Sequence, residues 1–298
     1  MRVGFAGLGV MGRPMARFVS GRLRSTGGTL VLLERDRTRV GEEFPDADWA
    51  ADPSDLGRRC DLVVLVVPSI VEIRALVLGD DGIAAGASGP LTVVVCSTTS
   101  PDDVRTLAAD VAGASHPVRI VDAPVSGGAE GAEAGTLSIM VGGADADVAP
   151  VLDVLSAAGT PTHLGPLGAG QVAKACNQLV VAAEVTALAE ASLLAERAGL
   201  DVAAMFDVLG RGYAASRVLE VKKARFANHD HSPSGPAKFM IKDLTAAVGE
   251  AERTGLRLVT AETLLSAFTE LTEAGLGDYD TAVMQRFIES RSEEWPRP

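Results

Sequence analysis

The sequence predicts an α/β protein in which a doubly wound, mostly parallel sheet is followed by an all-helical domain built on one long helix. Three observations predict this fold. Short apolar segments alternate with helical segments through the first half of the 298-residue chain. A Gly-x-Gly-x-x-Gly turn, formed by Gly7, Gly9 and Gly12, directly follows the first apolar segment. From about residue 171 onward, every segment has a helical pattern.

Six segments of the first half are expected to be strands. Residues 62–67 are apolar throughout, which is typical of a strand covered by helices on both faces. Between two strands, Ser100 can cap a helix that begins at Pro101, and the two aspartates that follow suit its positive end. The expected strands are residues 2–6, 29–34, 61–67, 91–96, 118–122 and 137–141.

The pattern changes near residues 161–170, where glycines and prolines precede a helix expected over residues 171–197. At 1.5 Å per residue this helix would be roughly 40 Å long. We assign residues 1–164 to the sheet domain and residues 165–298 to the helical domain, and expect a second ligand in a cleft between them. Further helices are expected over residues 202–209, 215–227, 239–253 and 259–273.

Composition argues against several classes of protein. A net charge of −12 argues against nucleic acid as the main partner. No apolar run approaches the roughly 20 residues that span a bilayer, and the N-terminus lacks a signal peptide's arrangement. Three cysteines without a CxxC pair fit a reducing compartment, so we expect a cytoplasmic protein without a membrane partner. No metal site is expected, because the four histidines are scattered at His116, His163, His229 and His231.

The glycine-rich turn predicts dinucleotide binding. Gly7 would make the tight turn, Gly9 would let a pyrophosphate approach the backbone, and Gly12 would let the next helix pack on the sheet. Glu34 ends the second apolar segment, 22 residues past Gly12. The residues expected to hold the cofactor here are Gly7, Leu8, Gly9, Val10, Met11, Gly12, Glu34 and Arg35.

Glu34 also bears on the choice between NAD and NADP. A carboxylate at this position can bind the ribose 2′-OH and would repel a 2′-phosphate, which favours NAD. However, Arg35, Arg37 and Arg39 follow, and arginine can pair with a 2′-phosphate. We therefore expect NAD and leave NADP open.

Two segments offer groups for a substrate beside a nicotinamide. After a predicted strand, Ser126, Gly127 and Gly128 could cradle a carboxylate with a hydroxyl and backbone N–H groups, or could form an ordinary turn. In the long helix, Lys174 could donate a proton to an alkoxide, with Asn177 and Gln178 on the same helix side. A lysine in an apolar helix more commonly extends its ammonium group to water, and this alternative stays open for Lys174.

Lys242 is open to the same two interpretations. It could reach the cofactor or substrate, or it could pair with a surface carboxylate.

Four motifs of this chain, in this order, resemble those of the β-hydroxyacid dehydrogenases, which include 3-hydroxyisobutyrate dehydrogenases and tartronate semialdehyde reductases. They are residues 7–15 (GLGVMGRPM), 122–128 (DAPVSGG), 168–178 (GAGQVAKACNQ) and 242–244 (KDL). The resemblance covers nearly the whole chain. It implies an N-terminal Rossmann domain, a helical C-terminal domain, and a homodimer or homotetramer.

By matching position, the resemblance implies a role for each candidate residue. Lys174 would be the catalytic acid/base, and Ser126, Gly127 and Gly128 would bind the substrate carboxylate. The pair Asn177 and Gln178, on the substrate side, is similar to the tartronate semialdehyde reductase version. The loop at residues 228–236 does not match the pattern of any specific substrate, so the substrate stays open. Further cofactor contacts would come from Val67, Pro68, Thr98 and Lys242.

The sequence therefore predicts an NAD(P)-dependent oxidoreductase that acts on a small β-hydroxy acid or its semialdehyde. Two alternatives remain at this stage. Imine reductases share the architecture, but they commonly carry Asp or Tyr where this chain has Lys174. A non-catalytic NAD(P)-binding sensor would need neither the lysine nor the carboxylate cradle.

Overall fold

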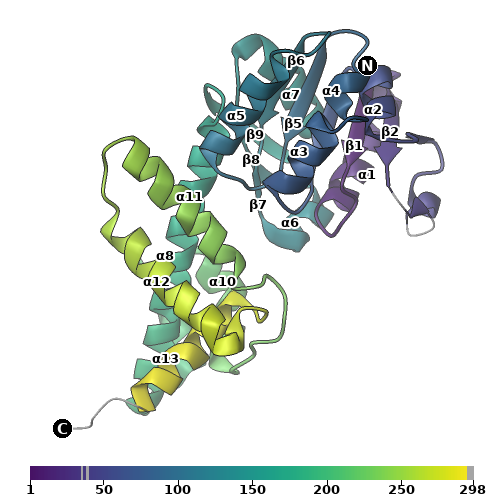
Figure 1. The fold of residues 1–298 in the computed structure, drawn as a ribbon. Coiled ribbons are helices and arrows are strands. Elements are labelled where there is room, and N and C mark those ends of the chain that lie inside the picture. The colour runs from purple at the N-terminus through teal and green to yellow at the C-terminus, as the bar shows by residue number, and fades with distance from the viewer. Residues whose placement is uncertain (35, 38–39, 294–298) are drawn as a thin grey trace. The chain divides into compact units, whose positions relative to one another are not determined.

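The computed structural model describes residues 1–34, 36–37 and 40–293 of the chain (Figure 1). It divides into two compact units, Met1–Lys174 and Ala175–Pro298. The division falls inside one helix, α8 (Ala169–Arg197), so no loop separates the two units. The predicted functional domains, residues 1–164 and 165–298, have a different boundary from these compact units and remain a prediction.

The described part of the first unit forms a nine-stranded sheet in the order β3-β2-β1-β4-β5-β6-β8-β7, with β9 paired to β8. The strands β1 to β6 run parallel, while β8 is antiparallel to β6 and β7. The order of the first six strands is that of a Rossmann fold. The strands are β1 (Arg2–Ala6), β2 (Thr29–Leu33), β3 (Asp48–Trp49), β4 (Leu62–Leu65), β5 (Leu91–Val95), β6 (Val118–Asp122), β7 (Val125–Ser126), β8 (Leu137–Gly142) and β9 (Gly159–Gly165).

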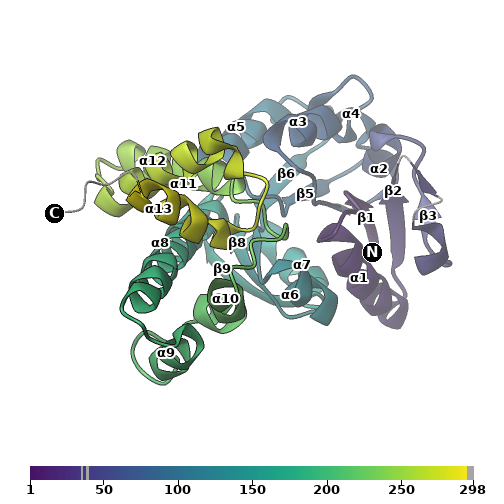
Figure 2. The same cartoon turned by 90° about the horizontal axis from the view of Figure 1, so that it is seen from below.

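Helices cover both faces of this sheet (Figure 2). One face packs against α1 (Gly12–Thr26), α6 (Gly128–Ala134) and α7 (Asp145–Leu155). Strand β4 supplies Leu62 and Val64 to that side and Val63 and Leu65 to the other, which explains its unbroken apolar sequence. The other face packs against α2 (Pro53–Arg59), α3 (Ile70–Leu78), α4 (Ile83–Gly86) and α5 (Pro101–Val111).

The register of the parallel strands places four strand ends in one row. Ala6 pairs with Leu65, Leu65 with Val95, and Val95 with Asp122. The loops that follow β1, β4, β5 and β6 therefore start side by side at one edge of the sheet. In open α/β sheets this carboxyl edge is where ligands bind.

The second unit is helical, and its core contains the rings of Phe206, Phe226 and Phe268. The first two rings lie 6.2 Å apart between centroids. Beyond Leu271 the chain passes into a π-helical turn, so the helix expected over residues 259–273 ends slightly early. The helices that pack here are the second half of α8 with α9 (Val202–Leu209), α10 (Arg217–Ala227), α11 (Phe239–Arg253), α12 (Val259–Leu271) and α13 (Met284–Glu293).

By length and apolar composition alone, α8 could cross a membrane, and among the described residues it is the one helix that could. The sequence has no unbroken apolar run of this length, because Lys174, Asn177 and Glu184 interrupt α8, but the helix as a whole is apolar enough to be a candidate. Its side chains Val185 and Ala189 are fully buried in the core of the helical unit. Core helices of soluble proteins have the same length and composition, so this feature is weak evidence for a membrane.

The predicted fold class is confirmed, and three strands were missed. Two of them, β3 and β7, are only two residues long and give no periodic pattern. The third, β9, has the sequence GTPTHLG and alternates between half-buried and exposed residues. Its glycines and proline predict a loop, whereas pairing with β8 makes it a strand.

Candidate active site

The glycine-rich turn connects β1 to α1. Gly7 has a φ of 95°, and a Cβ there would overlap the carbonyl of Val66. A Cβ on Gly12 would overlap the carbonyl oxygen of Gly7, because α1 begins at Gly12 and packs tightly on the turn. Both positions therefore require glycine for steric reasons.

The start of α1 suits an anion. Its first turn carries no acidic side chain, and the N-cap residue Met11 provides no side-chain hydrogen bond to the helix. Gly9 is exposed, and so is Val10, at 71%. The positive end of the helix and its backbone N–H groups can therefore meet a pyrophosphate, so the residues present fit a dinucleotide.

Glu34 lies one residue beyond β2, which ends at Leu33. The backbone N–H of Asp36 lies 3.4 Å from its Oε1 atom. Arg37 stacks over the ring of Trp49 at 5.3 Å and donates to the Ala50 carbonyl at 3.2 Å. The Arg37 side chain is thus engaged within the protein by Trp49 and Ala50. Arg35 and Arg39 lie outside the described residues.

The loops after β4 and β5 are joined by a hydrogen bond. The N–H of Val67 donates to Ser97 Oγ at 3.0 Å. Ser97 is buried, Thr98 is half-buried and Pro68 is exposed. The segments predicted to contact the cofactor, Val67–Pro68 and Thr98, therefore belong to one connected region at the carboxyl edge of the sheet.

Asp122, at the end of β6, anchors the start of α8. Its side chain is fully buried and accepts from the N–H groups of Gly168 and Gln171, each at 2.7 Å. Side chains at Gly142 or Gly170 would overlap the carboxylate or the backbone that surrounds it. Burial raises the pKa of Asp122 to about 6, while these N–H groups oppose the rise.

Gln171 links α8 to the loop after β5. It is 1% exposed, accepts from the N–H of Thr99 at 3.1 Å and donates to the Ser97 carbonyl at 2.9 Å. Lys174 follows one helical turn later and is only 7% exposed. The sequence reasoning missed Asp122 and Gln171. A carboxylate that ends an apolar strand and an amide within an apolar helix were the available signals.

The Ser126–Gly128 segment lies where β7 meets α6. Ser126 pairs with Ser138 of β8, which fixes the end of the short strand. Gly127 and Gly128 are exposed and have φ values of 139° and 65°, which disfavour other residues. This turn is compatible with the carboxylate cradle, which remains a prediction.

The remaining predicted residues form a polar chain in the helical unit. Asn177 donates to Gln178 Oε1 at 2.9 Å, and Gln178 donates to Asp243 Oδ2 at 2.6 Å. Lys242 donates to Asp243 Oδ1 at 2.6 Å. Asp243, which is 5% exposed, thus joins both predicted segments and was missed as a site residue. Its place inside the KDL motif was the available signal.

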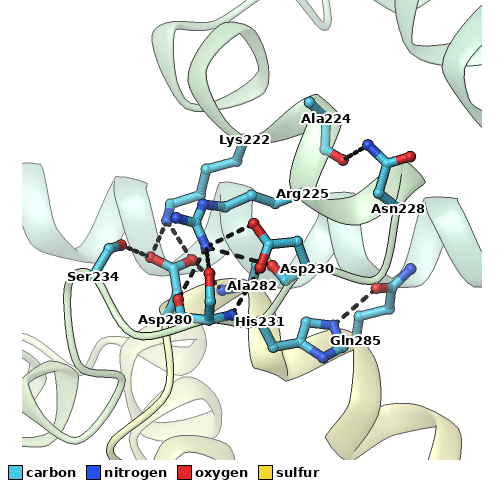
Figure 3. Close-up of polar contacts among 11 residues, drawn as sticks. Lys222, Ala224, Arg225, Asn228, Asp230, His231, Ser234, Asp280, Ala282 and Gln285 are labelled. Carbon is cyan, nitrogen blue, oxygen red and sulfur yellow. Dashed lines mark hydrogen bonds and ion pairs between the residues drawn. The ribbon is translucent and has the colours of Figure 1, made fainter.

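The unmatched loop at residues 228–236 belongs to a second polar cluster, which we call the Asp280 cluster (Figure 3). Fully buried Asp280 accepts from Lys222 Nζ at 2.7 and 2.9 Å and from the hydroxyl of Ser234. His231 contacts buried Gln285 at 3.1 Å. These contacts tie the loop to α10 and α13 and give it a structural role.

Comparison with known proteins identifies the class of this protein. Residues 2–177 match the family model described as the NAD binding domain of 6-phosphogluconate dehydrogenase. Residues 168–288 match the model described as NAD-binding of NADP-dependent 3-hydroxyisobutyrate dehydrogenase. The protein is therefore an NAD(P)-binding oxidoreductase.

Similar proteins match over nearly their whole lengths. The chain is 32% identical to 2-hydroxy-3-oxopropionate reductase of Escherichia coli, covering 97% of each chain. It is 31% identical to NAD-dependent L-serine dehydrogenase of Pseudomonas aeruginosa, covering 97% of this chain and 98% of the relative. A crystal structure of 3-hydroxyisobutyrate dehydrogenase from Salmonella typhimurium superimposes with a TM-score of 0.82 at 27% identity, covering 96% and 99%. The chain belongs to the β-hydroxyacid dehydrogenase family.

Proposed function

We propose that this oxidoreductase transfers hydride between a nicotinamide and a small β-hydroxy acid or its semialdehyde, with Lys174 as the general acid/base. The observation that carries the proposal is the environment of Lys174. This lysine is 7% exposed on α8, one turn after the residue that is hydrogen-bonded to the Ser97–Thr99 loop. A buried ammonium beside the carboxyl edge of a dinucleotide-binding sheet favours chemistry over a solvated surface role.

The names of the relatives support the substrate class. L-serine, 2-hydroxy-3-oxopropionate and 3-hydroxyisobutyrate each combine a carboxylate with an oxygen on the third carbon. A protein of this class needs one group for the carboxylate and one for that oxygen. Ser126, Gly127 and Gly128 would hold the carboxylate, and Lys174 would serve the oxygen.

The proton transfer follows from the properties of an amine. In oxidation, neutral Lys174 accepts the proton of the substrate hydroxyl as the carbon loses its hydride. In reduction, the Lys174 ammonium donates a proton to the carbonyl oxygen, which would otherwise become an alkoxide. The bound nicotinamide supplies the hydride acceptor or donor. In the helical unit, Asn177, Gln178 and Lys242 would bind substrate or cofactor, and Asp243 would orient the last two.

We test this assignment with Lys174→Ala. We expect kcat to fall by at least roughly 100-fold on every accepted acid, because general acid–base catalysis contributes about that much or more. Cofactor binding should stay close to that of the parent. Added primary amines should restore part of the activity of the variant. Lys223→Ala is the control, since Lys223 is an exposed lysine that pairs with Asp207.

The substrate panel should contain small β-hydroxy acids, their semialdehydes and a cyclic imine, each with NAD and NADP. An active Lys174→Ala variant would overturn the role of the lysine. Turnover of the imine alone would overturn the substrate class. We also expect a homodimer or homotetramer, which light scattering of the purified protein can measure.

A further inference from the structure

The side chain of Gln171 bridges two elements that lie far apart in the sequence. Its Oε1 atom accepts from the Thr99 N–H at 3.1 Å and its Nε2 atom donates to the Ser97 carbonyl at 2.9 Å. The residue is 1% exposed, so neither bond can be exchanged freely with water. Leaving either partner unsatisfied in such a place is costly.

The bridge requires an amide. One end must accept a hydrogen bond and the other must donate one, and a side-chain amide of this length does both. A methionine of similar size cannot donate and is only a weak acceptor. An ionised glutamate can accept from Thr99 but meets the Ser97 carbonyl with a second acceptor, whereas a protonated glutamate can donate to it.

Gln171 is also held through its backbone. Its N–H donates to Asp122 at 2.7 Å, and the Gly168 N–H donates to the other oxygen of the same carboxylate. The loop at its other end is fixed in turn, because Ser97 Oγ accepts from the Val67 N–H. Thus the first turn of α8 is tied to the ends of β4, β5 and β6.

Lys174 lies three residues beyond Gln171 in α8, which places the two side chains on the same side of the helix. We propose that Gln171 is a positioning residue. By fixing the first turn of α8 to the Ser97–Thr99 loop, it holds Lys174 at the place where the ammonium group meets the substrate oxygen. This inference rests on the proposed function. It assigns Gln171 no contact with substrate.

Gln171→Met tests the inference by removing both bonds while keeping the length of the side chain. We expect kcat to fall by roughly 10- to 100-fold, because small misplacements of a catalytic group have effects of that order. The KM for the cofactor should change by less than kcat does, since the glycine-rich turn and the Val67–Ser97 hydrogen bond are untouched, although Thr98 lies in the loop that loses its bonds to Gln171. A double variant with Lys174→Ala should be no slower than Lys174→Ala alone.

Gln171→Glu provides a readout that a purely structural role would not move. At high pH its carboxylate faces the Ser97 carbonyl, and kcat should be as low as in Gln171→Met. As the pH falls and the glutamate protonates, the donor returns, and the ratio of variant to parent kcat should rise. A ratio that stays flat with pH overturns the proposal.

Gln285→Met is the matched control. Gln285 is also a fully buried amide whose two ends are both engaged: its Nε2 atom donates to Ser192 and to the Phe226 carbonyl, and its Oε1 atom contacts His231. It belongs to the Asp280 cluster and not to the candidate site. This variant should lose stability, as Gln171→Met does, yet keep the parent kcat and pH profile. Thermal unfolding and cofactor titration confirm that each variant is folded.

The two proposals fail in different ways. An inactive Lys174→Ala beside a Gln171→Met variant with the parent kcat overturns the positioning role alone. An active Lys174→Ala overturns the proposed function and this role with it.

Discussion

Fully buried Asp280 and half-buried Lys222 form an ion pair in the helical unit (Figure 3). Burial alone would raise the pKa of Asp280, but Lys222, Ser234 and the Ala282 N–H outweigh it and lower the pKa below its usual value. Lys222→Met leaves a buried carboxylate without its partner. We expect a loss of about 3–5 kcal/mol in the free energy of unfolding at pH 7, measured with urea.

The pH dependence of that loss gives a second check. Because the pKa of Asp280 is depressed in the folded protein, its stabilising effect is present above the ordinary pKa near 4 and disappears as the pH falls through the folded value. The gap between parent and variant should therefore narrow in acid. Lys223→Met, at the adjacent but more exposed lysine, should stay close to the parent. Equal losses in both variants would contradict the ion pair's role.

The pKa of Asp122 is shifted in the opposite direction from that of Asp280. Burial raises its pKa to about 6, so the folded state binds the proton more tightly than the unfolded state does. Its contribution to stability should grow as the pH falls through 6 and level off below about 4. The shift corresponds to about 3 kcal/mol. Measured from pH 7 to pH 4, the parent should gain most of that amount, about 2.4 kcal/mol, relative to Asp122→Asn, because the unfolded aspartate is itself about half protonated at pH 4.

An exposed aspartate variant, Asp46→Asn, controls for the removal of one negative charge. If the parent and Asp122→Asn show parallel stability curves from pH 7 to pH 4, the raised pKa is wrong.

Among the elements, those with a strong local signal were predictable from sequence. The apolar run of β4 and the start of α5 are the clearest cases. At α5, Ser100 and Asp103 form a reciprocal capping box, as the Ser-Pro-Asp-Asp sequence indicates. Strand β9 was not predictable, because its sequence has no apolar alternation and it becomes a strand only by pairing with β8. The local sequence pattern indicates helix caps and apolar faces, but it does not indicate which strand a polar strand pairs with.

Helix α1 allows a matched glycine test of cofactor binding. Gly12→Ala places a Cβ on the Gly7 carbonyl, so the turn must open and the affinity for NAD should fall by at least about tenfold. Gly21→Ala lies in the same helix with no atom within 4 Å of its Cβ. That variant should bind NAD normally and gain about 0.5–1 kcal/mol in stability. Fluorescence titration with the reduced cofactor measures the affinity of both variants, and urea unfolding measures the gain in stability. Equal affinities would show that the glycine-rich turn does not bind the cofactor as predicted.

For the whole molecule, the sequence located the candidate site but not what supports it. The motifs identified Lys174 and the glycine turn because these residues occur in recognisable local patterns. The supporting bonds of Asp122 and Gln171 span 46 and 74 residues. Side-chain bonds over such separations follow from the fold as a whole. The same is true of the Asp280 cluster, where Lys222 and Asp280 are 58 residues apart.

Cofactor choice is a property of the whole molecule, because a net charge of −12 adds to the local effect of Glu34. NADP carries an additional phosphate, which both the carboxylate and the overall charge repel. Arg37 is engaged with Trp49 and Ala50 and offers little compensation. NAD at about 100 times its Kd should stabilise the protein by about 2.7 kcal/mol. The same concentration of NADP should give a smaller rise in Tm, and Glu34→Gln should narrow that difference. An equal or larger rise with NADP in the parent protein would show that the arginine-rich segment, and not Glu34, determines the choice.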